Sequence, residues 1–147
     1  MTTAPSPVRS RAIVITGLVL LTLPVSAAMP RARVFSGGSL DKPVVISDLS
    51  ENAAITEATH PASVTWQQIA ARPSLDLAEF SFPGWEAATA HGRPETEVRP
   101  AEATSHARFY PATAGEPALI VGSVRAQAID ADGLAILKKH GIPVLVR

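Results

Sequence analysis

Short stretches of hydrophobic residues alternate with polar, turn-forming stretches along this chain, and the pattern predicts short strands and helices. Residues 31–35 and 43–47 are β-branched or apolar and are separated by a loop rich in serine and glycine, which predicts two strands that can pair as a hairpin. Asp48 or Ser50 can cap a helix over residues 49–58, because either side-chain oxygen can accept from the free N–H groups of its first turn.

The middle of the chain has a less regular pattern. His60-Pro61 is predicted to close the first helix, and Ser63 to cap a second helix whose apolar residues are Val64, Trp66, Ile69 and Ala70. That helix should stop before Pro73, because proline disfavours the helical conformation in the preceding residue. Residues 75–82 are ambiguous between a strand and a helical turn, as short apolar runs usually are.

The next segment is predicted to be turn, helix and irregular connection in that order. Pro83-Gly84 favours a turn, and residues 85–91 contain good helix formers. Gly92 can end this helix in the left-handed conformation. The polar stretch 92–101 contains two prolines and indicates an irregular surface connection.

The C-terminal third has the clearest pattern. Its predicted strands are residues 107–110, 118–122, 124–129 and 143–147. Asp130 is expected to cap a helix over residues 131–140, with an acid in the first turn, cations in the last turn and Gly141 as the stop. A helix that links two strands by short connections is the usual way to build a parallel pair. The whole pattern therefore predicts an α+β or α/β fold, a single small domain with a mixed sheet and three to four short helices.

The N-terminus has the layout of a cleaved signal peptide. Residues 1–11 contain Arg9 and Arg11 but no acid, and residues 12–23 carry no charge. Pro24 follows, and then small residues in the pattern that a signal peptidase recognises, which places cleavage after Ala27 or Ala28. We expect a signal peptide over residues 1–27 and an exported domain over residues 28–147, carried by the general secretion route to the periplasm or the outside of a bacterial cell.

An uncleaved membrane anchor is the alternative, since residues 12–28 form an apolar span near the lower length limit for crossing a bilayer. Cleavage would leave 120 of the 147 residues, enough for one domain. The whole chain has 13 basic and 13 acidic residues, and removal of the two arginines near its start leaves a formal charge of −2. This charge argues against nucleic acid or an anionic membrane surface as a partner.

Several kinds of chemistry are excluded or unsupported. The chain has no cysteine, which excludes a lipidated N-terminal cysteine, a thiol nucleophile and a thiolate metal site. The four histidines show no close spacing typical of metal ligands, and the Asp130–Gly133 stretch lacks the remaining ligands of a calcium loop. No nucleophile elbow or phosphate-binding loop is present. We therefore expect neither a metal nor a cofactor.

The strongest candidate site is a polar and aromatic strip near residue 108. On a strand, His106, Arg108 and Tyr110 fall on one face, and Trp85 is a further aromatic candidate. These groups could recognise a carboxylate through paired hydrogen bonds or a sugar through stacking. A half-exposed strand face that covers the edge of the core, with Trp85 inside that core, is the structural alternative.

These observations favour a binding or interaction module of the cell envelope that acts on a small molecule or an envelope protein. A small exported hydrolase is the alternative. It would use His106 or His91 with an acid such as Glu79, and it requires these side chains to converge in a pocket.

Overall fold

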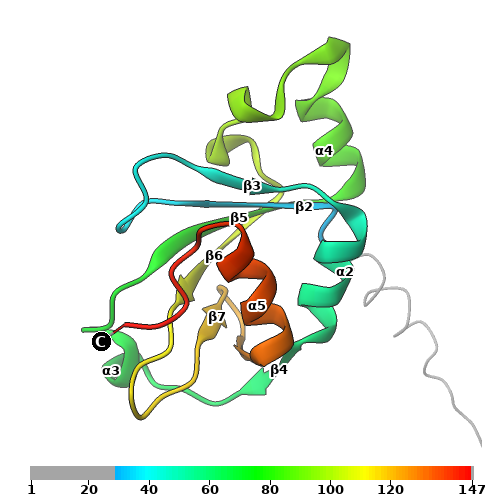
Figure 1. Ribbon diagram of the computed structural model, residues 1–147. Helices are drawn as coiled ribbons and strands as arrows, with labels where there is room; N and C mark the ends of the chain where they lie inside the picture. Colours follow the sequence, from blue (N-terminus) through cyan, green and yellow to red (C-terminus); the bar gives the residue numbers. More distant parts are fainter. Residues whose placement is uncertain (1–28, 147) are drawn as a thin grey trace, which may run out of the picture.

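Seven strands form one antiparallel sheet in the computed structural model, which describes residues 29–146 (Figure 1). The strand order across the sheet is β3-β2-β5-β6-β7-β8-β4. The strands are β2 (Ala32–Ser36), β3 (Val44–Ile46), β4 (Thr59–Ala62), β5 (Leu75–Phe80), β6 (Ser105–Tyr110), β7 (Leu119–Val121) and β8 (Ala126–Ile129). Because helices are added to a sheet whose named strands all pair antiparallel, the architecture is α+β.

Four α-helices lie within the described residues. They are α2 (Leu49–Glu57), α3 (Trp66–Ile69), α4 (Phe82–Ala88) and α5 (Ala131–Lys139). Two predicted caps are confirmed: the Asp48 carboxylate accepts from the backbone N–H of Glu51, and the Asp130 carboxylate accepts from that of Asp132. No helix among residues 29–146 is both long enough and apolar enough to cross a membrane. The predicted signal peptide lies outside the described residues.

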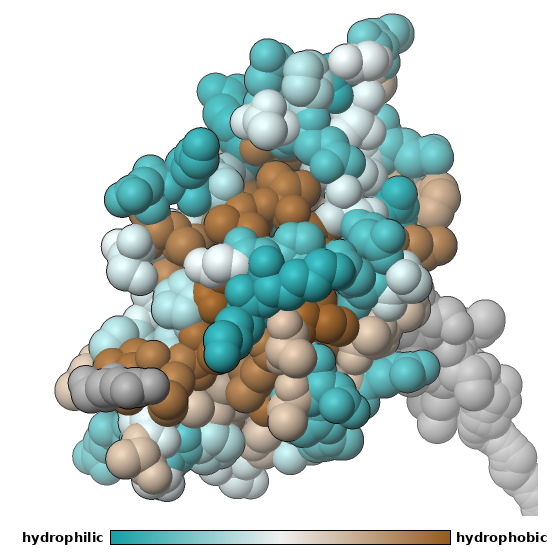
Figure 2. All heavy atoms as spheres, viewed as in Figure 1, coloured by the Kyte–Doolittle hydropathy of each residue, from teal (hydrophilic) through white to brown (hydrophobic). Residues whose placement is uncertain are grey.

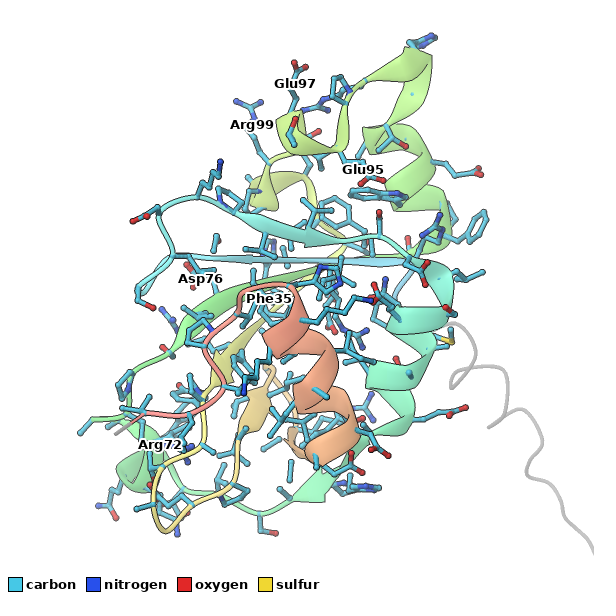
Figure 3. The ribbon with its side chains drawn as sticks, in the orientation of Figure 1. Phe35, Arg72, Asp76, Glu95, Glu97 and Arg99 are labelled. Atoms are coloured by element: carbon cyan, nitrogen blue, oxygen red, sulfur yellow. The ribbon has the colours of Figure 1, made fainter. Side chains whose placement is uncertain are left out.

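One face of the sheet packs against α2 and α5. Phe35 and Phe109 meet edge to face with 5.8 Å between ring centroids, and Figure 3 shows Phe35 near the C-terminal end of α5. Ile55 of α2 and Leu137 of α5 complete the contact from the helix side. On the same side of the molecule, Figure 2 shows hydrophilic surface over α5 and over the segment that projects at the top, with hydrophobic surface between them over β3.

The opposite face carries two separate apolar clusters. Phe80, Trp85 and Val98 belong to a cluster over β2 and β5, which α4 covers. Ile69 of α3 belongs to a second cluster over β6, β7 and β8, together with Tyr110. The sheet surface between these clusters is therefore free to carry polar residues.

The ambiguous segment 75–82 forms β5 up to Phe80. Leu75 and Leu77 point into the helix-covered core, whereas Ala78 and Phe80 belong to the cluster on the opposite face. A central strand buried on both faces lacks the regular alternation of a surface strand. This burial explains why the sequence pattern did not distinguish strand from helix.

Two predictions between α2 and β5 were wrong. His60-Pro61 does not close the first helix, which ends at Glu57, but lies within β4, the edge strand that pairs only with β8. Proline is tolerated there because an edge strand has one side without ladder hydrogen bonds. The cap of α3 is Thr65 rather than Ser63: the Thr65 hydroxyl accepts from the N–H of Gln68, and the Gln68 side chain accepts from the N–H of Thr65.

The predicted turn at Pro83-Gly84 was also wrong, since both residues lie in the first turn of α4. Ser81 caps this helix by accepting from the N–H of Gly84 at 3.1 Å. Proline suits the first helical turn because its missing N–H would have no intrahelical partner there. The helix ends at Ala88, before the predicted His91, which has a left-handed φ of 60° in a 3₁₀ turn.

Residues 90–102 form a projecting segment of three 3₁₀ turns, Ala90–Gly92, Glu95–Glu97 and Pro100–Glu102, at the top of Figure 1. The Arg93 guanidinium closes it with two hydrogen bonds to the Glu102 carboxylate, 2.6 and 2.7 Å long. These bonds hold the pKa of Glu102 down to about 2. Figure 3 shows the side chains of Glu97 and Arg99 pointing away from the sheet.

The C-terminal segment was predicted to form a strand parallel to the one before α5. Instead, Leu145 forms a single parallel bridge with Ala112, beyond the end of β6. The Ala112 N–H donates to the carbonyl of Val144, and the Val146 N–H donates to that of Ala112. Since β7 and β4 already occupy both sides of β8, the returning chain cannot pair there.

Candidate functional site

The open part of the sheet face carries a polar stripe that crosses three strands. We define the polar stripe as Ser36 on β2, Asp76 on β5 and His106 and Arg108 on β6. The register pairs Ser36 with Asp76, and Asp76 with Arg108, so these residues lie in one row across the sheet. His106 lies two positions before Arg108 and therefore on the same face, as the sequence predicted.

Arg108 and Asp76 form an exposed ion pair in the centre of the stripe. The Arg108 Nη1 atom lies 3.2 Å from the Asp76 Oδ1 atom and donates to the Ser74 hydroxyl at 3.0 Å. Both charged side chains are more than half exposed. The carboxylate largely balances the positive charge of the guanidinium, and the pair presents donors and acceptors side by side.

The polar stripe forms one wall of a cavity of about 390 Å³, which we call the stripe cavity. Its lining residues are Trp66, Asp76, His106, Ala107, Arg108, Tyr110 and Val121. The structure therefore brings together the three strand residues that the sequence singled out, and it adds Trp66 and Asp76, which the sequence analysis did not select. Trp66 is 71 % exposed, an unusual position for so large an apolar ring.

The two tryptophans lie in opposite environments, and Trp85 follows the structural alternative of a core residue. Trp85 is only 4 % exposed and meets Phe80 edge to face at 5.1 Å between ring centroids. It belongs to the core on the α4 side and does not line the stripe cavity. Because α3 begins at Trp66 and lasts one turn, Ile69 takes the buried position and the Trp66 ring is left outside.

Tyr110 forms the floor of the stripe cavity and is a buried side chain rather than an exposed one. It is buried beneath Arg72, whose guanidinium carbon lies 5.8 Å from the centroid of the phenol ring. Arg72 is itself fixed, because it donates to the carbonyls of Pro111 and Pro117 at 2.8 Å each. Figure 3 shows Arg72 beside α3, where it ties that helix to the loop after β6.

A second cavity occupies a notch in the sheet. β6 pairs with β7 only from Arg108 onward, so residues 105–107 of β6 pair with β5 alone. The β7–β8 turn, residues 122–125, closes the notch at one end, with a hydrogen bond from the N–H of Gly122 to the carbonyl of Arg125. The cavity in this notch has a volume of about 360 Å³, and His106 lines both it and the stripe cavity.

The notch has a mixed lining, in which hydroxyl, amide and charged side chains alternate with apolar residues such as Phe80 and Ile120. Its polar side chains are Glu79, Ser81, Thr104, Ser105, His106, Ser123, Arg125 and Gln127. A third cavity of about 370 Å³ lies between α3 and the β7–β8 turn, and we call it the α3 groove. Its apolar lining residues include Trp66 and Val124. The Val124 residue is 89 % exposed.

Glu79 in the notch is already engaged by a buried cation. Its Oε2 atom lies 3.4 Å from the Nε atom of Arg33, a residue that is nearly inaccessible to solvent. Burial lowers the pKa of Arg33, and the attraction of Glu79 opposes that effect. Arg33 also donates to the side chain of Asn52 at 3.0 Å. Glu79 therefore serves first as the counter-charge of a buried guanidinium.

The histidine and glutamate of the predicted hydrolase are only partly brought together. His106 and Glu79 both line the notch, but they occupy neighbouring register positions on opposite faces of the sheet. His91 lies apart from them in the projecting segment. Among residues 29–146, the histidines that meet a carboxylate are His60 with Asp130 and His140 with Glu51.

Within the part of the chain that the structure describes, no three histidine, aspartate or glutamate side chains gather closely enough to hold a metal ion. Comparisons with known proteins do not place the chain in a family: no family model matches it, and neither a curated protein nor a solved structure does so.

Proposed function

We propose that this chain is an exported binding module whose stripe cavity holds a saccharide or a similar polyhydroxylated molecule. The observation that carries the proposal is the exposed Trp66 ring beside the Arg108–Asp76 pair in one cavity. A flat aromatic surface can cover the apolar C–H face of a sugar ring, while planar charged groups bind its hydroxyls. Ligand sites typically combine an apolar wall with a few such polar groups.

The Arg108–Asp76 pair favours a sugar over a carboxylate ligand. A carboxylate would have to share the guanidinium with Asp76 and would meet a like charge within hydrogen-bonding distance. Neighbouring hydroxyl groups can instead donate to Asp76 and accept from Arg108 at the same time. The two residues together therefore suit an uncharged ligand with paired hydroxyl groups.

Binding should be measured by titration calorimetry with mono- and disaccharides. We expect Trp66→Ala and Arg108→Ala to lower the affinity by at least about tenfold, which corresponds to about 1.4 kcal/mol. Phe82→Ala is the matched control, because Phe82 is also an exposed aromatic but lies at the start of α4. Equal affinities of all three variants and the unchanged protein would contradict the proposed site.

The exported location is a separate part of the proposal. It is supported by the two arginines, the uncharged apolar run and the small residues that end at Ala27 or Ala28. N-terminal sequencing of the protein recovered from a secreting bacterial host should begin at Ala28 or Met29. A protein that begins at Met1 and stays with the membrane fraction would support an uncleaved anchor.

A small hydrolase is the second candidate function, favoured by His106 and Glu79 lining the same notch. In this case His106 would act as the general base on a substrate in the notch, while Glu79 stays paired with Arg33. The test is hydrolysis of chromogenic glycosides and esters by the unchanged protein and by His106→Ala. Turnover that His106→Ala abolishes would establish the hydrolase, whereas bound ligand that is never cleaved would support the binding module.

A further inference from the structure

We infer that the ligand is a linear, uncharged oligosaccharide that follows one continuous groove around the β7–β8 turn. This inference rests on the proposed saccharide site and extends it from the stripe cavity to the two cavities beside it. It assigns a ligand-binding role to the notch and to the α3 groove.

The three cavities adjoin one another around residues 122–125. His106 and Ala107 line both the notch and the stripe cavity. Trp66 and Val121 line both the stripe cavity and the α3 groove. The turn residues themselves line the notch on one side and the α3 groove on the other. Shared lining residues therefore connect the stripe cavity to the α3 groove through Trp66 and to the notch through His106.

Each cavity is large enough for only a small ligand. Their volumes lie between 360 and 390 Å³, near the lower end of the range of about 300–1,000 Å³ for ligand pockets. A single sugar ring would leave the other two cavities empty, whereas a chain of several rings would fill all three. The arrangement therefore favours a polymer with one unit in each cavity.

The charges along the groove favour an uncharged polymer. Its charged lining residues, apart from histidine, are Asp76 and Glu79 against Arg108 and Arg125. Two acids balance two bases, so neither an anionic nor a cationic chain gains a net attraction. The hydroxyl and amide groups of the notch suit hydroxyl-bearing units, and Trp66 and Val124 suit their apolar faces.

An extended peptide is the competing polymer, because residues 105–107 of β6 lack a partner on the β7 side. Peptides that add a strand to a sheet obtain their affinity from main-chain hydrogen bonds along a free edge. Here the free stretch covers three residues, because β6 begins at Ser105 and pairs with β7 from Arg108 onward. Such a short edge offers too few hydrogen bonds, and it leaves the polar side chains of the notch unused.

The test compares oligosaccharides of increasing length by calorimetry. The probes are cello-, malto- and chito-oligosaccharides of one to six units, together with a library of extended peptides. We expect the affinity for one series to rise by about tenfold or more between two and four units. Affinity that does not change with length would overturn this inference but not the saccharide site. No binding of any series, or binding of peptides alone, would overturn both.

Arg125→Ala separates the outer part of the groove from the stripe cavity. Arg125 is exposed in the turn and lines both flanking cavities. We expect Arg125→Ala to lower the affinity for four units by about fivefold and to leave the affinity for two units unchanged. Arg99→Ala, an exposed arginine of the projecting segment, is the matched control. An Arg125→Ala protein that binds four units as tightly as the control would contradict the extended groove.

Discussion

At the scale of single residues, Arg33 and Asn52 show how a polar network is accommodated inside the core. Asn52 donates to the carbonyls of Ile46 and Asp48, at 2.9 and 3.0 Å, and accepts from Arg33. Arg33 has its remaining charge partner in Glu79, a quarter of whose side chain is exposed. A buried charge is stable only when it is paired and hydrogen-bonded, so this network ties α2 to the sheet.

Glu79→Gln should lower the free energy of unfolding by about 3 kcal/mol, because it leaves the Arg33 charge buried without a counter-charge. Urea denaturation at neutral pH provides the measurement. Asp76→Asn is the control: it breaks an ion pair whose side chains are both more than half exposed, and it should cost less than about 1 kcal/mol. Equal losses of stability in the two variants would show that the Arg33–Glu79 pair stabilises the fold no more than the Arg108–Asp76 pair does.

Trp85→Ala should destabilise the fold by about 3–5 kcal/mol, because it empties a buried aromatic site against Phe80. Trp66→Ala should change the stability by less than about 0.5 kcal/mol, because the ring is mostly exposed. Thermal and urea unfolding of both variants would separate the two roles. A large loss of stability in Trp66→Ala would mean that this ring supports the fold rather than a ligand.

At the scale of elements, α5 packs unusually close to the strand and helix beneath it. A Cβ atom built on Gly133 would lie 2.7 Å from Ile129 Cγ1 and 2.8 Å from Ala58 Cβ. The glycine is therefore needed for close approach of the helix, rather than for the sharp turn of a calcium loop. The Asp130 and Asp132 that precede it serve the N-terminus of the helix.

Gly133→Ala should therefore lower the free energy of unfolding by about 1–3 kcal/mol through overpacking. In an exposed helix the same change would stabilise the protein by up to about 1 kcal/mol. Gly115→Ala is the matched control, since a Cβ atom there meets nothing within 4 Å. A stabilised Gly133→Ala protein in the same urea titration would contradict this packing.

At the scale of the whole molecule, ion pairs join segments that are far apart in the chain. Glu51 of α2 accepts from Lys139 at 2.5 Å and from His140 at 2.9 Å, at the far end of α5. Both hydrogen bonds lower the pKa of Glu51, and the one from Lys139 has the larger effect. Within the projecting segment, Arg93 is the chief cause that lowers the pKa of Glu102 to about 2. Both carboxyls therefore hold their protons less tightly in the folded chain than in the unfolded chain.

The stability should consequently fall as the pH falls. Both carboxyls contribute fully to the free energy of unfolding above pH 4.5, their pKa in the unfolded chain. This contribution is lost as the pH falls toward their lower pKa values in the folded chain. The urea midpoint should decrease between about pH 6 and about pH 3, and less steeply in the Glu51→Gln and Glu102→Gln variants. High salt should weaken the effect, because these groups lie at the surface. If the urea midpoint fell equally steeply with pH in the unchanged protein and in both variants, Glu51 and Glu102 would not be the groups responsible.

Part of this organisation could be predicted from the sequence. The caps at Asp48 and Asp130 were found because a capping residue and its N–H partner lie within three positions of each other. The common face of His106 and Arg108 followed from the two-residue period of a strand. These signals are local, so they need no knowledge of the rest of the chain.

The sequence by itself thus determined the hairpins, the caps of α2 and α5 and the common face of His106 and Arg108. Only the tertiary structure decided that Asp76 pairs with Arg108, that Trp66 is exposed and Trp85 buried, and that the short β7 leaves a notch beside His106. The physical reason is that these properties depend on burial and strand order. Both are set by contacts between residues far apart in the chain, which no local pattern records.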